Sequence, residues 1–136
     1  MLSAALTSFA RERLLAGDLR RAKVLLEEPR KTDSHREELL LGLAELARAE
    51  GHTVDCARLA LEAVQESRRK VNLGTQAEAW IERALALGKL GAPSKAADAL
   101  GQARPLVARW PDPQLQLRLS EVESRIRTNQ PSLSAN

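Results

Sequence analysis

The sequence predicts an all-α protein of about seven helices. Among its 136 residues there are two Trp, one Phe and no Tyr, although strands favour aromatic and β-branched residues. Leu, Ala, Glu and Arg, which are strong helix formers, are abundant. Between single glycines and prolines the apolar residues recur every three or four positions, which is the spacing of a helix with one buried face. The length is that of one domain.

The first half of the chain divides into two expected helical hairpins. The first covers residues 2–29 and turns at Gly17, with Asp18 as the cap of its second helix. The second covers residues 34–70 and turns at Gly51. In each case a glycine after one helix is followed within two residues by a start signal for the next.

A third hairpin and a single last helix follow. The third hairpin covers residues 75–109 and turns at Gly91, after which Pro93 suits the first turn of a helix. A last helix covers residues 113–128, and residues 129–136 form a polar tail expected to be flexible. The further capping signals are Ser34 with Glu37, Thr53, Thr75 with Glu78, and Asp112 before Pro113.

Three glycines and one proline interrupt the expected helices. Gly42, Gly88 and Gly101 each cost about 1 kcal/mol relative to Ala, and we expect them to let a neighbouring helix approach closely. Pro105 removes a backbone donor and is expected to kink or shorten its helix.

The glycine spacing indicates a repeat. The interval from Gly17 to Gly51 matches the tetratricopeptide period of about 34 residues, and the interval from Gly51 to Gly91 is somewhat longer. The segment AEAWIERALALGKLG, residues 77–91, resembles the first helix of that repeat, with Trp80 at an apolar position. Residues 3–109 thus resemble a degenerate tetratricopeptide array with long helices, as in bacterial regulators. The resemblance implies antiparallel hairpins stacked as a short right-handed solenoid over residues 1–128.

The last expected helix has the pattern of a cap. Its apolar residues form one stripe, opposite charged ones, as the end of a stacked array requires. These apolar residues are Leu115, Leu119, Val122 and Ile126. The start of the chain has no such cap, so we expect either a fragment of a longer array or a first hairpin that meets a partner, and we favour the fragment.

The resemblance implies a protein–protein interaction module, a scaffold or adaptor that forms part of a larger bacterial regulatory or signalling protein. In such arrays the first helix of each hairpin lines a concave groove that binds a partner peptide or domain. Three residues of this groove would be apolar anchors, and for each charged one the alternative is a solvated helix face. The residues expected in the groove are Thr7, Arg11, Glu38, Leu41, Glu45, Arg48, Glu78, Ile81, Glu82, Leu85 and Lys89.

Two alternatives remain open. The hairpin 2–29 could pair with its copy in a second chain and form a homo-oligomer. The basic clusters 20–23, 30–31 and 68–70 could contact nucleic acid, but the net charge is only +3 and aromatic residues for base stacking are scarce. We therefore consider nucleic acid the less favoured partner.

The sequence does not indicate an enzyme. Cys56 has His52 one helical turn before it, but Cys56 stands where a small buried residue belongs. The chain contains two His and one Cys, too few for a convincing zinc site, and no glycine-rich phosphate loop. We expect no metal, cofactor or small-molecule substrate. The absence of a signal-peptide pattern and of a long apolar run predicts a cytoplasmic protein without membrane contact.

Overall fold

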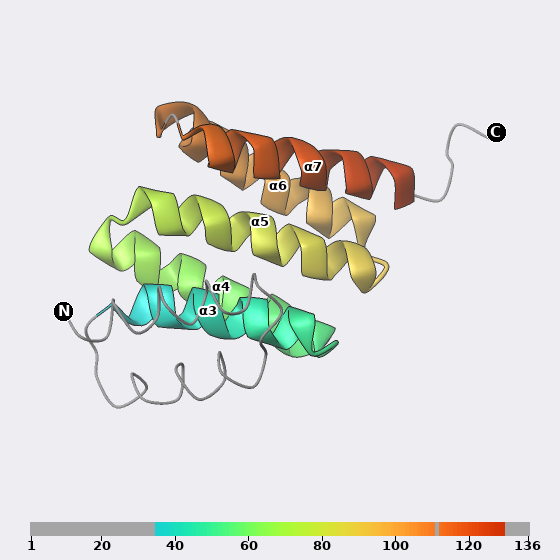
Figure 1. Cartoon of the computed structure of the whole chain (residues 1–136), viewed down its shortest axis with the longest axis horizontal. Coiled ribbons are helices and arrows are strands. Elements are labelled where there is room, and N and C mark those ends of the chain that lie inside the picture. The colour runs from blue at the N-terminus through green and yellow to red at the C-terminus, as the bar shows by residue number, and fades with distance from the viewer. Residues whose placement is uncertain (1–34, 111, 130–136) are drawn as a thin grey trace.

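A computed structural model of the chain describes residues 35–110 and 112–129, which form five α-helices (Figure 1). They are α3 (Arg36–Ala49), α4 (Thr53–Lys70), α5 (Leu73–Lys89), α6 (Pro93–Arg109) and α7 (Pro113–Asn129). These residues contain no strand, so the predicted all-α class is confirmed for the described part. The predicted hairpin 2–29, with groove residues Thr7 and Arg11, and most of the tail lie outside it.

The helices form two layers. Consecutive helices run antiparallel, with α3, α5 and α7 side by side in one layer and α4 and α6 in the other (Figure 1). Each helix contacts the next one along the chain, and α5 also contacts α3 and α7. Among the described helices, neither α3 nor α4 contacts α6 or α7. Within residues 35–110 and 112–129, helix packing is therefore between near neighbours in the sequence.

The helices begin at regular intervals. Thr53, Leu73, Pro93 and Pro113 are the first residues of α4 to α7, so their starts are evenly spaced along the chain. Pro93 and Pro113 begin helices as predicted, because proline's fixed φ suits the first helical turn. A unit of two helices therefore has the same length whether it is counted from Thr53 to Pro93 or from Leu73 to Pro113.

Two of the predicted caps differ from the structure. The helix α5 begins two residues before Thr75, because Asn72 is its N-cap and accepts a hydrogen bond from the Thr75 N–H at 3.2 Å. Thr53 is the first helical residue of α4, and the preceding His52 makes no side-chain cap bond. The Asp112 cap is confirmed, since its Oδ1 accepts from the Gln114 N–H at 2.9 Å.

The turns after α3, α4 and α5 share one geometry. Each contains a residue with a left-handed backbone, namely Gly51 (φ 83°), Val71 (φ 58°) and Gly91 (φ 77°). The next N–H then bonds to a carbonyl five residues back, which satisfies a helix end. These bonds run from His52 to Ala47 (2.8 Å), from Asn72 to Ser67 (2.9 Å) and from Ala92 to Leu87 (2.9 Å).

Small side chains fill the contacts between helices. Ala60, Ala63, Ala84, Ala96 and Ala103 are fully buried, which lets helix backbones approach closely. Larger residues of α7 complete the core over α5 and α6. The predicted apolar stripe of the last helix is confirmed, because all its members are buried: Leu115, Leu119, Val122 and Ile126.

The internal glycines and the proline have different outcomes. A Cβ at Gly88 would lie 3.5 Å from Ile126 Cγ1, so α7 packs over Gly88 as predicted, and Gly42 is buried. A Cβ at Gly101 would meet nothing within 4 Å, so the predicted close approach there is wrong. Pro105 does not end α6, which continues to Arg109. Because proline has no N–H, Pro105 cannot donate the usual helical hydrogen bond to the Gly101 carbonyl four residues earlier. Gly101 is exposed, so water can donate to that carbonyl instead.

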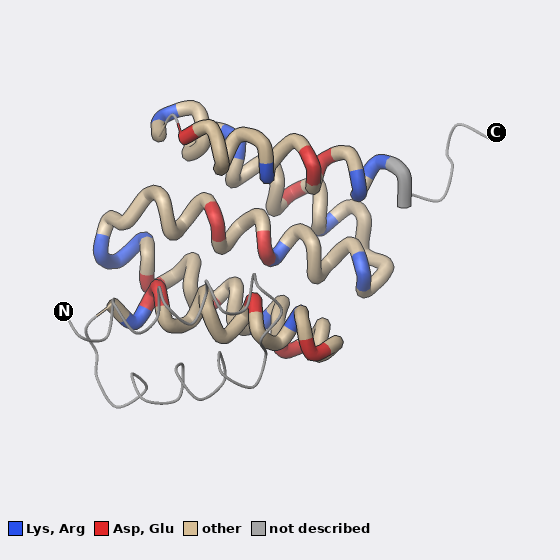
Figure 2. Tube along the Cα trace, viewed as in Figure 1, with Lys and Arg blue, Asp and Glu red and all other residues tan. Residues whose placement is uncertain are grey.

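The charged residues of both signs are spread over all five helices (Figure 2). None of the helices in the described part is both long and apolar enough to cross a lipid bilayer.

Candidate functional site

The predicted groove residues that the structure describes all lie on α3 and α5. These two helices and α7 form one layer, which we call the odd-helix face. The structure brings the centres of these helices together, since α5 contacts both α3 and α7. The candidate site is therefore this face.

The three predicted apolar anchors are core residues. Leu41 and Ile81 have no exposed surface, and Leu85 retains 9%. Ile81 and Leu85 belong to the cluster packed between α5, α6 and α7, and Leu41 packs with α4. In this arrangement none of the three side chains offers a surface on which a partner could dock.

The charged members of the predicted groove divide into exposed and buried ones. Lys89 is exposed, and Glu38 and Glu78 are partly exposed. Glu45 and Glu82 are buried. A partner approaching this face would therefore meet charges rather than the predicted anchors.

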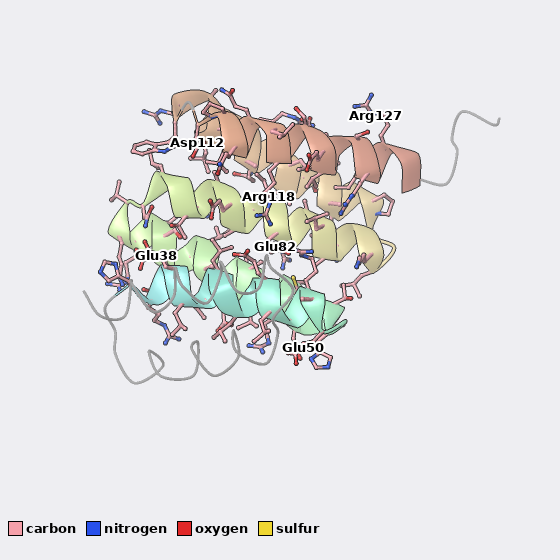
Figure 3. All side chains as sticks on the ribbon, viewed as in Figure 1. Glu38, Glu50, Glu82, Asp112, Arg118 and Arg127 are labelled. Carbon is pink, nitrogen blue, oxygen red and sulfur yellow. The ribbon has the colours of Figure 1, made fainter. Side chains whose placement is uncertain are left out.

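Glu82 lies near the middle of the odd-helix face, with Arg118 beside it (Figure 3). Its carboxylate receives three contacts. Arg48 of α3 donates from Nε to its Oε2, and Arg118 of α7 donates from Nη2 to its Oε1 at 2.6 Å. The Cys56 thiol of α4 lies 3.6 Å from Oε2. Thus α6 is the only described helix that sends no side chain to this carboxylate.

The charges of this cluster compensate one another. A buried carboxylate is costly unless it is paired and hydrogen-bonded, and here each oxygen has its own guanidinium. Glu45, also buried, is close enough to contribute a second negative charge. Burial lowers the pKa of Arg48, but the charge and hydrogen bond of Glu82 raise it more, so that pKa lies above its ordinary value. Arg48 therefore stays charged.

Cys56 is an inert thiol in this cluster. Its side chain is fully buried, as the sequence predicts. Burial, together with the charge of Glu82, raises the pKa of the Cys56 thiol to about 12. His52 is exposed at the start of α4. Since the thiolate is the nucleophilic form, Cys56 has the opposite of the pKa shift that catalysis requires.

Sequence reasoning included Arg48 and Glu82 in the groove but missed Arg118 and the burial of Glu82. A signal for the burial exists. Glu82 lies three residues after Ala79 and four before Ala86, on one helical stripe, and both alanines are fully buried. The Arg118 partner is 36 residues away and has no local signal.

The basic cluster 68–70 makes intramolecular contacts. The guanidinium of Arg68 lies 5.5 Å from the centre of the Trp80 ring. Arg69 pairs with Glu66 at 3.0 Å. Lys70 pairs at 3.2 Å with Glu37, the predicted capping residue, which also accepts from Asn72 at 3.3 Å. The cluster thus stabilises the end of α4.

The opposite layer has a hollow, because α4 and α6 do not touch. It has a volume of about 270 Å³, with an apolar floor and a charged rim. Its lining residues are Leu61, Trp80, Arg83, Leu87, Lys95, Asp98, Ala99 and Gln102.

In the described part of the chain no three His, Cys, Asp or Glu residues are placed to hold a metal ion. Comparisons with protein-family models, with curated proteins and with solved structures give no match to this chain.

Proposed function

We propose that this chain is a non-catalytic protein–protein interaction module, built as a tetratricopeptide-like stack of helical hairpins, and that its partner binds the odd-helix face. The observation that carries the proposal is the packing between near neighbours only. In the part of the chain that the structure describes, each helix contacts the helix that follows it, and α3 and α5 also contact the second one along. The absence of contacts between the outer helices of this part supports an open stack rather than a closed bundle.

The regular spacing of equivalent contacts supports the repeat. Ala79 and Ala86 of α5 pack against the preceding hairpin, α3–α4. One unit of two helices further along, Leu119 and Ile126 of α7 pack against the hairpin α5–α6. Residues 40 positions apart thus belong to core clusters with the preceding hairpin in both units, which supports the proposed repeat.

The chemistry of the exposed side chains favours a partner recognised by charge. Lys89, Glu121 and Arg125 are exposed on this face, and Glu38 and Glu78 are partly exposed. The apolar members are buried. We propose a peptide segment that carries charges of both signs, held on a face whose helices are already packed, so that the partner bears most of the ordering cost.

The test uses peptides selected from a random displayed library on the full chain, with affinities then measured by fluorescence anisotropy. Lys89→Glu is compared with Lys95→Glu, which changes another exposed lysine, in α6. Glu78→Lys is compared with Asp98→Lys, also in α6. We expect at least about a fivefold loss of affinity for the α5 variants, which corresponds to roughly 1 kcal/mol, and little change for the α6 variants.

Equal effects on both faces, or no selected peptide at all, would contradict the proposal. Two further measurements on the unsubstituted protein test the alternatives of self-association and nucleic-acid binding. A mass that rises with concentration in analytical ultracentrifugation would indicate self-association. Retention on DNA that falls steeply with salt would indicate nucleic-acid binding.

A further inference from the structure

We propose that Arg48, Glu82 and Arg118 form an ionic clasp that fixes the position of α7 relative to α3 and so sets the curvature of the helix stack. The proposal does not depend on the proposed function. It concerns two helices that do not contact each other but that send a guanidinium to the two oxygens of one carboxylate.

The geometry makes the two arginines act together. Arg48 binds Oε2 and Arg118 binds Oε1, so neither displaces the other. Because the guanidinium is a planar, rigid group of donors, each bond restricts the direction from which its helix approaches. An arrangement of α3, α5 and α7 that satisfies both oxygens must therefore keep both guanidinium groups within reach of Glu82.

Burial makes the clasp hard to open. Glu82 has no exposed surface, whereas the side chains of Arg48 and Arg118 are 29% and 25% exposed. If α7 turned away from α5, one carboxylate oxygen would lose its donor inside the protein, which is strongly unfavourable. A change of curvature within the stack would therefore have to break this bond first.

A second ion pair at α7 provides a contrast. Arg104 of α6 pairs with Glu123 of α7 at 2.8 Å, but the two side chains are 54% and 28% exposed. Water can replace either partner there, and such surface pairs contribute little. Both pairs link α7 to an earlier helix, but the Arg104 pair tolerates movement and the Arg118 pair does not.

The experiment measures the distance between α3 and α7 in the full chain by electron–electron double resonance. Spin labels are placed at Ala49→Cys and Ser124→Cys, both exposed. Two helix spacings separate these positions by about 20 Å. The native Cys56 is buried, so it stays unlabelled, which the unsubstituted chain verifies.

Arg118→Met keeps an apolar stem and removes the guanidinium, and Arg104→Met is the matched control. We expect Arg118→Met to shift and broaden the distance distribution, Arg104→Met to leave it unchanged, and Arg118→Lys to restore it partly. A second label pair, Ala49→Cys with Gln65→Cys in the hairpin α3–α4, and the circular dichroism should be the same in all three variants.

A folded Arg118→Met variant with the wild-type α3–α7 distribution would overturn the proposal. So would equal shifts in Arg118→Met and Arg104→Met. If Arg118→Met does not fold, Arg118→Gln, a polar but uncharged side chain, takes its place: a displaced distribution supports the clasp, and an unchanged one overturns it.

Discussion

Val71 ends α4 in the left-handed backbone conformation in which Gly91 ends α5, with φ of 58° and 77°. For a residue with a side chain this conformation costs about 1–2 kcal/mol, and a β-branched residue is rarely found in it. The turn still forms, because the N–H of the next residue, Asn72, bonds to the Ser67 carbonyl. The turn at Val71 is therefore a strained copy of the turns at Gly51 and Gly91.

Val71→Gly should stabilise the protein. The Val71 side chain is 75% exposed, so its removal loses little burial, and glycine adopts the left-handed backbone without strain. We expect the free energy of unfolding in urea to rise by about 1 kcal/mol. Gly91→Val, the reverse change at the equivalent turn, should lower it by at least as much. A lower stability of Val71→Gly would contradict this account.

Gly101→Ala should also be stabilising. Gly101 lies inside α6, and an added Cβ meets nothing within 4 Å. Alanine favours a helix by about 1 kcal/mol over glycine, so thermal and urea unfolding should both shift upward. Gly91→Ala is the control: at φ 77° the methyl group introduces strain, and stability should fall.

Arg118→Met should destabilise the protein more than Arg104→Met. Loss of Arg118 leaves one oxygen of the buried Glu82 without its donor, at a cost of about 2–4 kcal/mol. Loss of Arg104 removes an exposed pair and should change stability by less than about 1 kcal/mol. Urea unfolding of the two variants measures the difference, and similar values would show that Glu82 finds another partner.

Cys56 should resist alkylation in the folded protein. Its thiol is buried and has a pKa of about 12, so the thiolate fraction at pH 8 is roughly one in ten thousand. Iodoacetamide should modify the chain in urea but not under native conditions, as followed by mass spectrometry. Rapid native modification would mean that α4 opens around Cys56.

The same thiol should make stability fall at alkaline pH. The pKa of Cys56 is raised from an ordinary value of 9.0 to about 12, so above pH 9 only the unfolded chain loses the proton. The contribution of the raised Cys56 pKa to the free energy of unfolding is complete below pH 9 and declines by about 1.4 kcal/mol per pH unit above it. Cys56→Ala lacks this term, so the difference in stability between the two proteins should narrow from pH 9 to 11. If the curves of stability against pH ran parallel for the two proteins, the raised pKa of Cys56 would be contradicted.

Local signals predicted the helices well where one residue type determines the geometry. Gly51 and Gly91 marked the turns because they take positive φ, and Pro93 and Pro113 marked helix starts. Val71 gave no signal, since a valine rarely takes that backbone. The start of α5 was placed at Thr75 because the Thr75–Glu78 spacing fits a capping box, whereas Asn72 is the cap.

The candidate site was only partly predictable. The tetratricopeptide resemblance implied that Arg48, Ile81 and Glu82 line one groove, but a resemblance does not reveal what covers each side chain in this chain. Ile81 was expected as an exposed anchor and is buried. The partner of Glu82 in α7 depends on packing between helices 36 residues apart, which no pattern within one helix encodes.

The even spacing of helix starts has a consequence for how such a chain can form and change. Since every helix–helix contact among α3 to α7 joins helices close in the sequence, loop closure in this part costs little entropy, and its folding should be fast and spread from any one hairpin. An insertion or loss of one whole two-helix unit at a turn would keep the order and alternating direction of the remaining helices, but between α5 and α7 it would break the Glu82–Arg118 pair. Genes for such proteins can therefore change length in whole units most readily at turns that no such buried pair spans.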